Sequence, residues 1–533
     1  MTVLPQASHV LFDAHFVDLD GENQGADAIA FSGGRVLAVG RAEDLSPLIG
    51  PRTTLESLGG RSLLPAFTDA HLHLELYARS LDQVDCETHT VEECVERLRR
   101  RAATIPPGKW ILGHGWNQNE WGRPPATDLL NQAVPHHPVY ATAKSLHAAW
   151  ANASALRLAQ TNADTPDPDG GKLLRDSTGA PNGILLESAC SLVSRQVPAP
   201  DLNELCVLVG HAQESLWRRG IACVHDFDGP RLLQTVQRLR HSGGLGLRIL
   251  KSIPRERLPE AIGLGVSAGL GDHWIRLGHV KLFADGALGS RTAAMLSAYD
   301  GEPDNQGVLL LDEETIVEIG RQAATAGLSL AVHAIGDRST HAVICALHVL
   351  QQELSGWPQL LPHRIEHLQL LHPQDLARLA ELHCVASMQP IHATSDMLMA
   401  DRYWGDRTRY AYGWKIALRA GMTLAFGSDA PVEDPDPLLG LRAAIARRRS
   451  DGSPGPSGWV PEEKLSLREA LRAYTLGPAH ASGSAHEQGA LRPGYLGDLV
   501  VLNADPLALS PEELREVRVV GTMVDAVWRF RDF

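Results

Sequence analysis

Residues 62–73 read Ser-Leu-Leu-Pro-Ala-Phe-Thr-Asp-Ala-His-Leu-His, an apolar run that ends in two histidines. The run over Ser62–Asp69 predicts a buried strand. Because side chains alternate along a strand, His71 and His73 are expected on the same side. Two imidazoles on one side can chelate a metal ion, and a pair of ordinary surface or core histidines is the competing interpretation.

Further apolar runs follow along the chain, and helical patterns such as Glu314–Ala326 and Pro373–Leu382 separate most of them. Repeated strand–helix units imply a parallel sheet, and eight of them favour an α/β fold of the closed (β/α)₈ TIM-like barrel type. After Ser62–Asp69 the predicted strands are Ile221–Asp226, Leu247–Ile253, Ile275–Ala284, Leu328–His333, His363–His367, Cys384–Gln389 and Met422–Ser428.

The two ends of the chain differ from this middle. Near the N-terminus His9–Leu19 alternates loosely, and Ala28–Val39 carries a hairpin signal at Gly33-Gly34. Near the C-terminus Asp498–Leu502 and Val517–Phe530 read as strands, with Gly494 and Gly521 as the expected turns. The simplest arrangement packs both termini into one small composite β-sandwich domain.

These patterns predict three parts: residues 1–62 and 485–533 as the two halves of the sandwich, and 63–484 as the barrel. A long insertion over about 76–220, rich in Trp, Asn, Pro and Gly, separates the first two barrel strands. Since it leaves the barrel after strand one, we expect it to act as a lid or subdomain over the catalytic mouth.

Polar side chains end four of the predicted strands. The fourth, fifth, sixth and eighth strands finish near Lys281, His333, His367 and Asp429. Such groups are costly at the end of an apolar strand unless they have partners. A barrel directs these ends to one face, where barrel active sites lie, so they are expected to converge with the two histidines after strand one.

Four imidazoles and a carboxylate suit Zn²⁺ or a similar divalent ion. Lys281 is the unusual member, because a protonated ammonium repels a metal. It is either a structural cation paired with Asp285 or a lysine carboxylated by CO₂, and the second route needs a neutral amine that desolvation favours. The pattern leaves both alternatives open.

Composition excludes several classes of protein. With 533 residues, 44% of them hydrophobic and 21% charged, the chain is typical of a globular protein, and no apolar run approaches a membrane span. The net charge of −14 argues against a nucleic-acid partner. Seven scattered cysteines without a Cys-x-x-Cys pair, and an N-terminus without signal-peptide character, indicate a reduced, cytoplasmic protein. The expected partner is a small-molecule substrate.

At this point the motifs are recognisable. The chain resembles the amidohydrolase superfamily, and more narrowly the amidohydrolase 3 branch that includes N-substituted formamide deformylase-like proteins. The resemblance covers nearly the whole chain. It is carried by Asp69–His73; His147–Trp150 with Asn152 and Leu156; Thr165–Pro168 with Gly170 and Gly171; Val280–Thr292; His333–Arg338; Arg364–His367; Gln389, Pro390 and His392; and Gly427–Val432.

The resemblance implies a barrel with a composite sandwich and hydrolysis of carbon–nitrogen bonds other than peptide bonds. It implies one or two divalent ions, with zinc the expected metal. His71, His73 and Asp429 would bind one ion, His333 and His367 the second, and a carboxylated Lys281 would bridge them. One departure is Ala66, where the family usually has glycine; we expect a local backbone effect there and no loss of metal.

The implied mechanism attacks an amide carbonyl with a metal-activated hydroxide, since a bound water has a pKa near 7. Asp429 would take the water's proton and return it to the leaving amine; a structural turn residue is the alternative. Expected substrate contacts are His147, Arg291, Gln389 and His392. Arg291 either clamps a substrate carboxylate or pairs with Asp285.

His225 and Asp226, at the end of the second strand, are expected either to support a metal ligand or to contact substrate. Trp116 and Trp121 are expected to pack within the insertion. Two other readings remain open. The same metal site serves ester hydrolysis, deamination or isomerisation in related enzymes, and a metal-stabilised binding or regulatory protein without turnover is the alternative of another class. The sequence names neither the substrate nor the oligomeric state, for which a homodimer is one option.

Overall fold

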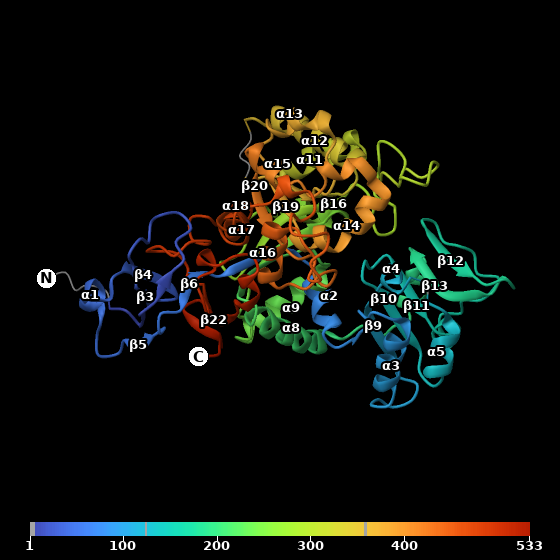
Figure 1. The fold of residues 1–533 in the computed structure, drawn as a ribbon, viewed down its shortest axis with the longest axis horizontal. Coiled ribbons are helices and arrows are strands. Elements are labelled where there is room, and N and C mark those ends of the chain that lie inside the picture. Colours follow the sequence, from blue (N-terminus) through green and yellow to red (C-terminus); the bar gives the residue numbers. More distant parts are fainter. Residues whose placement is uncertain (1–5, 123–124, 357–359) are drawn as a thin grey trace. The chain divides into compact units, whose positions relative to one another are not determined.

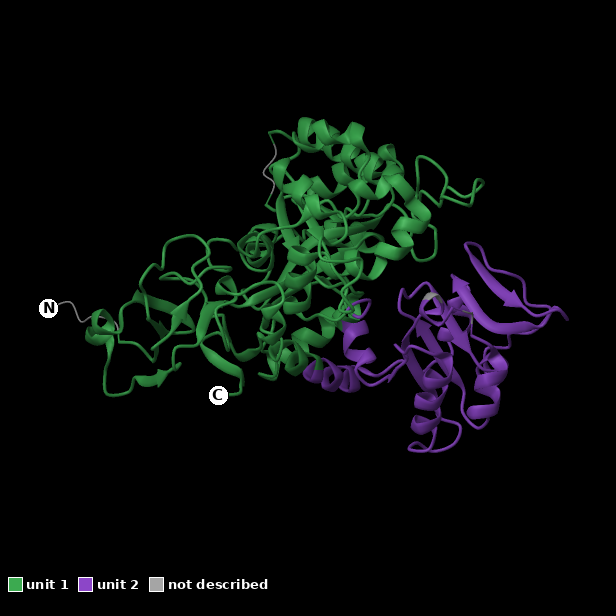
Figure 2. Ribbon diagram, viewed as in Figure 1, with its two compact units in different colours: residues 1–74, 212–430, 434–533 green, residues 75–211, 431–433 purple. Residues whose placement is uncertain are grey.

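The computed structural model describes residues 6–122, 125–356 and 360–533. The chain divides into two compact units (Figure 2). The first comprises Met1–Leu74, Ala212–Ala430 and Asp434–Phe533, and the second comprises Glu75–His211 with Pro431–Glu433. The chain therefore leaves the first unit directly after the His-x-His pair.

A sheet of eight parallel strands, all within the described residues, forms the centre of the first unit (Figure 1). The strands lie side by side in chain order, which confirms the predicted (β/α)₈ barrel. They are β7 (Phe67–Leu72), β14 (Ile221–Asp226), β15 (Arg248–Pro254), β16 (Ile275–Phe283), β17 (Leu330–Ala334), β18 (Arg364–His367), β19 (Val385–Met388) and β20 (Thr423–Phe426).

The seam between β20 and β7 closes just beyond the regular strands. Ser428 donates from its backbone N–H and its hydroxyl to the Asp69 carboxylate, at 3.1 and 2.5 Å. The Asp429 N–H donates to the His71 carbonyl at 2.6 Å, and the His73 N–H donates to the Ala430 carbonyl at 2.9 Å. These bonds bring the polar ends of the first and last strands together.

Helices follow the barrel strands. In α11 the Asp312 side chain accepts from the Thr315 N–H and caps the first turn, and the apolar face turns inward, as the sequence predicts. The helix expected over Pro373–Leu382 is instead a 3₁₀ turn, Pro373–Asp375, followed by the short α13. The helices are α8 (Leu202–Trp217), α9 (Pro230–His241), α10 (Leu258–Gly263), α11 (Glu313–Thr325), α12 (Asp337–Glu353), α13 (Leu376–Leu379), α14 (Pro390–Trp404), α15 (Trp414–Arg419), α16 (Pro437–Ala446), α17 (Leu467–Tyr474) and α18 (Leu476–Ala481).

Both termini build the second layer of the first unit. One sheet joins N-terminal strands β2 and β6 to C-terminal strands β21–β23, and a second contains β1, β3, β4 and β5. Side chains of both sheets share one buried core. The strands are β1 (His9–Phe12), β2 (His15–Phe16), β3 (Ala28–Ser32), β4 (Arg35–Gly40), β5 (Thr54–Ser57), β6 (Ser62–Pro65), β21 (Leu499–Leu502), β22 (Val519–Val524) and β23 (Val527–Arg531).

Two sequence predictions about these strands are wrong. The single strand expected over Ser62–Asp69 is two strands in different sheets, β6 and β7, because the chain changes sheets at Ala66, whose N–H donates to the Asp498 carbonyl. The turn expected at Gly521 lies instead at Asp525 and Ala526, which both have left-handed backbone with φ near 60°. The Gly33-Gly34 hairpin is confirmed.

The second unit contains a sheet in the order β12-β13-β11-β10-β9-β8. Its core includes Trp116, whose indole donates to the Ala141 carbonyl and stacks on Trp121 at 6.0 Å, so both tryptophans pack inside the insertion as expected. Its elements are α2 (Leu74–Ser80, which begins in the first unit), β8 (Val84–Asp85), α3 (Val91–Ala102), β9 (Ile111–Trp116), α4 (Gln118–Trp121), α5 (Thr127–Ala133), β10 (Val139–Ala143), β11 (Ala148–Ala151), α6 (Ala153–Leu158), β12 (Gly171–Arg175), β13 (Pro181–Glu187) and α7 (Cys190–Ser194).

Across residues 6–122, 125–356 and 360–533, no helix combines the length and the apolar character that crossing a membrane requires.

Candidate metal centre

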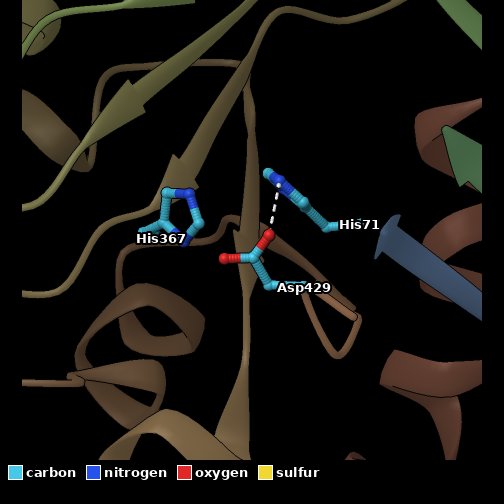
Figure 3. A group of neighbouring side chains, drawn as sticks. All are labelled: His71, His367 and Asp429. Carbon is cyan, nitrogen blue, oxygen red and sulfur yellow. Dashed lines mark ion pairs between the residues drawn. The ribbon is translucent and has the colours of Figure 1, made fainter. Parts of the chain in front are cut away.

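His71, His367 and Asp429 meet at the ends of β7, β18 and β20. One ligand atom from each residue lies within 4.8 Å of the others, and all three side chains are buried. Figure 3 shows the two imidazole rings on either side of the Asp429 carboxylate, with the 3.5 Å contact between His71 Nε2 and Asp429 Oδ1 dashed. The spacing suits three ligands of a single ion.

Two more of the predicted ligands join this group. His73 Nε2 lies 3.4 Å from Asp429 Oδ1. The His333 ring, on β17, lies 4.5 Å from the His367 ring, which in turn lies 4.8 Å from the His71 ring. The structure therefore brings together the four histidines and the carboxylate that the strand ends predict.

Carboxylates hold the far nitrogens of the first two histidines. His71 Nδ1 lies 2.6 Å from Glu366 Oε2, and His73 Nδ1 lies 3.2 Å from Asp228 Oδ1. A carboxylate at Nδ1 fixes the proton there and leaves Nε2 with a free lone pair. In both residues that Nε2 is the atom nearest Asp429.

The other two histidines have neutral acceptors. His367 Nδ1 lies 2.8 Å from Gln389 Oε1 and donates to it, so the Nε2 of His367 keeps its lone pair. His333 instead donates from Nε2 to the Gly286 carbonyl at 3.0 Å, so the Nδ1 of His333 keeps its lone pair. Each of the four imidazoles is thus oriented by a partner at one nitrogen while the other nitrogen can bind a metal ion.

Backbone geometry directs two of the ligands. Strand alternation places Glu366 and His367 on opposite faces, yet both reach His71. His367 has φ of 71°, in the left-handed region, and this turn at the end of β18 brings its ring back to the site. Asp429 has φ of 61°. Such backbone in non-glycine residues concentrates at functional sites.

Glycine at 427 permits the close approach of the first and last strands. A Cβ at this position would lie 2.4 Å from the His71 backbone nitrogen and 2.7 Å from Asp69 Oδ1. Larger residues are therefore excluded, and the Gly427-Ser428-Asp429 segment can bond to β7 only in this form.

The buried Arg364 anchors the partner of His71. Its guanidinium donates to both oxygens of Glu366, at 2.6 and 3.1 Å, and to the Ala70 carbonyl, Ser387 Oγ and His225 Nδ1. Burial raises the pKa of Glu366, but the Arg364 charge outweighs it and holds that pKa well below its ordinary value. Glu366 is thus a permanent anion behind His71.

Burial and neighbouring charges together set the protonation states of the four histidines and Asp429. Burial lowers the pKa of His71 to about 4 and that of His333 to about 3, so both imidazoles are neutral at pH 7. Burial also lowers the pKa of His73, but Asp228 and Asp429 raise it to about 10. Burial raises the pKa of Asp429, and the surrounding imidazoles hold it well below its ordinary value. The two carboxylates around His73 favour a positive charge there, either a proton or a metal ion.

Lys281 is buried on β16 between two aromatic rings. Its Nζ lies 4.6 Å from the Phe227 ring centroid and 4.8 Å from that of Phe283, and it has no hydrogen-bond partner among the described residues. Burial lowers its pKa to about 8. A buried amine without a partner in a metal-ligand cluster fits a group that is modified or bound when the site is complete.

The alternative ion pair between Lys281 and Asp285 is wrong. Asp285 instead accepts from the backbone N–H groups of Ala294, Ile335 and Gly336 and from Ser339 Oγ. The pairing of Arg291 with Asp285 is wrong for the same reason: Arg291 Nε lies 2.7 Å from Glu302 Oε1. Asp285 therefore ties the loops after β16 and β17 together.

The remaining predicted contacts fall in two places. Gln389 and His392 lie in the first unit beside His367, and His392 Nε2 is 3.9 Å from Asp429 Oδ2. His147 lies in the second unit, where its Nδ1 pairs with Glu187 at 2.8 Å. His225 supports the site indirectly through Arg364, and Asp226 accepts from the Leu74 N–H.

Sequence reasoning assigned no role to four important residues. Glu366 and Arg364 belong to a quoted motif, but their link to His71 depends on a contact across the barrel. Asp228 follows Asp226 at the spacing of the His-x-His pair, a signal that points to the same side of β14. Gln369 follows His367 at the same two-residue spacing, but an uncharged amide by itself does not indicate a metal or catalytic site.

Comparison with known proteins agrees with this site. The model of the amidohydrolase family matches residues 55–527. The chain belongs to the amidohydrolase family. This amidohydrolase is 30% identical to the Bacillus subtilis protein YtcJ over 95% of this chain and 96% of that one. It is 28% identical to an N-substituted formamide deformylase of Arthrobacter pascens, over 98% of each chain.

A solved structure extends the comparison. The crystal structure of an uncharacterized metal-dependent hydrolase from Pyrococcus horikoshii superposes with a TM-score of 0.77 at 28% identity, over 95% of this chain and 99% of that one. The family and its structural neighbours support a metal-dependent hydrolase, and the His71, His367 and Asp429 group is this amidohydrolase's candidate metal site.

Proposed function

We propose that this chain hydrolyses the carbon–nitrogen bond of a small-molecule amide, R–CO–NH–R′ + H₂O → R–COOH + R′–NH₂. One observation carries the proposal: the ligand atoms of His71, His367 and Asp429 lie within 4.8 Å of one another. The similarity to a protein named N-substituted formamide deformylase supports the choice of an amide over other hydrolysable bonds.

The donor set fits one or two divalent ions, with zinc the proposed metal because imidazole and carboxylate ligands suit it. His71, His73 and Asp429 would hold one ion, and His333 and His367 the second. When bound, such an ion supplies a nucleophilic water at neutral pH and polarises a carbonyl oxygen.

Lys281 is the proposed bridging residue. Its neutral Nζ would add to CO₂ and lose a proton, R–NH₂ + CO₂ → R–NH–COO⁻ + H⁺. This would give two oxygen ligands in place of a buried amine that has no hydrogen-bond partner in the part of the chain that the structure describes. The lowered pKa of the amine, about 8, increases the neutral fraction.

Asp429 is the proposed proton carrier. Its carboxylate is ionised and reaches His71, His73 and His392, so it lies at the centre of the polar cluster. It would accept a proton from the attacking water and deliver that proton to the leaving nitrogen, which must become an amine to depart.

The test is hydrolysis of matched amides and esters by the zinc-loaded chain. The panel contains N-butylformamide, N-butylacetamide and the corresponding butyl esters, and the released amine or alcohol is quantified. We expect amide hydrolysis, with kcat falling by about 10²- to 10⁴-fold in Asp429→Asn. The exposed Asp532→Asn is the matched control and should keep wild-type activity. Turnover of the esters alone would overturn the proposal.

A further inference from the structure

Three polar side chains around His367 have atoms without partners. Gln369, Gln389 and His392 are 3%, 2% and 7% exposed. Within the described residues, Gln369 Oε1, Gln389 Nε2 and His392 Nε2 are buried without a hydrogen-bond partner. Buried polar atoms are nearly always satisfied, so a group of three beside a reaction centre indicates a ligand that completes them.

Contacts tie the three residues to one another. Gln389 accepts from His367 Nδ1 at 2.8 Å. The His392 ring stacks on the His367 ring, with centroids 6.0 Å apart and planes 6° apart. Gln369 Nε2 lies 3.2 Å from His392 Nδ1. The three residues therefore form one connected group beside His367.

The hydrogen-bond network assigns a donor or acceptor role to each free atom. His367 must keep Nε2 free to bind a metal, so its Nδ1 carries the proton and Gln389 must present oxygen to it. The Gln389 amide nitrogen is then a free donor. The contact with His367 therefore fixes which way the Gln389 side-chain amide is turned.

His392 is assigned in the same way. Its Nε2 faces Asp429 Oδ2 at 3.9 Å, so a proton at Nε2 is favoured over a lone pair. Its Nδ1 is then an acceptor for the Gln369 amide nitrogen, which leaves Gln369 Oε1 as a free acceptor. The three residues thus offer a ligand two donors, at Gln389 Nε2 and His392 Nε2, and one acceptor, at Gln369 Oε1.

The backbone holds this arrangement in place. The Gln369 carbonyl accepts from the Tyr412 N–H at 2.6 Å, and the His392 N–H donates to the Gln389 carbonyl at 3.1 Å. His392 lies in the first turn of α14, directly after β19. These bonds hold the backbone of the three residues at the ends of β18 and β19.

We propose that Gln369, Gln389 and His392 form a subsite that recognises the substrate's amide group, and that this subsite selects primary and secondary amides. The carbonyl oxygen accepts from His392 Nε2 and the Gln389 amide, and the substrate N–H donates to Gln369 Oε1. The inference rests on the proposed function and narrows it, because tertiary amides and esters lack the N–H.

The first experiment compares substrates that differ by one methyl group. N-Butylformamide is paired with N-butyl-N-methylformamide, and N-butylacetamide with N-butyl-N-methylacetamide, on the zinc-loaded chain. We expect kcat/KM for the secondary amide to exceed that for the tertiary amide by about 100-fold, since the tertiary amide leaves the buried Gln369 Oε1 without a donor. Equal rates would overturn the subsite.

Variants separate hydrogen bonding from the bulk of the added methyl group. Gln369→Met removes the acceptor at nearly constant size. It also removes the donor to His392 Nδ1, which should slow both amides alike, so the measured quantity is the preference for the secondary amide, which should fall about 100-fold. The exposed Gln374→Met is the matched control and should keep the wild-type preference. A preference that survives in Gln369→Met would be steric and would overturn the assignment of Gln369.

His392→Phe gives a second, independent signature. The phenyl ring preserves the stacking on His367 but cannot donate to a carbonyl, so both members of each pair should slow by the same factor. Slowing of the secondary amide alone would overturn the assignment of the donor. Absence of turnover with all four amides would contradict the proposed function itself, whereas turnover without discrimination contradicts only the subsite.

Discussion

At the scale of single residues, the geometry of the metal site depends on a few backbone positions that accept only one residue type or conformation. Gly427 allows the last strand to approach His71, and left-handed backbone at His367 and Asp429 aims their side chains. The His-x-His pair could be predicted from alternation, but Glu366 and Asp228 could not be assigned, because their roles arise from contacts between strands that are distant in sequence.

Substitution of Gly427 by alanine should displace the end of β20. The added Cβ meets the His71 backbone, which cannot rotate away, so we expect a loss of about 1–3 kcal/mol in the free energy of unfolding, together with lower metal retention. Urea denaturation and metal analysis measure both effects. Gly210→Ala, where a Cβ meets open space within α8, should instead stabilise the chain by about 0.5–1 kcal/mol. Equal effects of the two substitutions would contradict the steric explanation.

The carboxylate behind His73 should set metal affinity. Asp228→Asn weakens the acceptor at Nδ1, and we expect zinc affinity to fall about 10- to 100-fold, measured by competition with a chromophoric chelator. Asp532→Asn, at an exposed position, is the control for the same chemical change. Unchanged affinity in Asp228→Asn would contradict this role of Asp228.

At the scale of elements, strand order was predictable and sheet membership was not. Seven of the predicted barrel runs coincide with strands, because buried parallel strands read as apolar runs bounded by helices. The sequence predicts one strand over Ser62–Asp69 because both halves of this run are apolar and buried. The strand pairing in the structure separates them: β6 pairs with β21 of the C-terminal strands, and β7 pairs with β14 of the barrel.

A buried ion pair joins the barrel to the composite sheet. Arg248 on β15 donates to both oxygens of Asp498, at 2.6 and 2.8 Å, just before β21. Asp498→Asn leaves the buried guanidinium only its longer, 3.4 Å pair with Asp525, and we expect a loss of about 1–3 kcal/mol in chemical denaturation. Asp505→Asn breaks an exposed pair with His15 and should change stability by less than about 1 kcal/mol. Similar losses in the two variants would contradict this role for Arg248.

At the scale of the whole molecule, many histidines are buried as neutral groups. Outside the metal-ligand cluster, burial lowers the pKa of His363 to about 4 and that of His279 to about 3. The unfolded chain binds protons at these positions below pH about 6.5, the ordinary histidine pKa, whereas the folded chain does not. Stability should therefore fall as the pH drops from 6.5 toward 4.

Each such histidine contributes a slope of up to about 1.4 kcal/mol per pH unit within that window. Urea midpoints measured from pH 8 to 4 should show the decline, and His363→Gln should show a shallower one. Metal release at low pH affects both proteins alike, so their difference isolates His363. Identical slopes would contradict the neutral, buried state of this residue.

The central claim is that the cluster around Asp429 binds a catalytic metal, and metal content per chain tests it most directly. Plasma mass spectrometry on protein purified without chelators should find one or two equivalents of a divalent ion. His71→Asn, folded by circular dichroism, should lose at least one equivalent and the amide hydrolysis with it. A folded wild-type chain that retains no divalent ion, even after dialysis against micromolar zinc, would contradict the account.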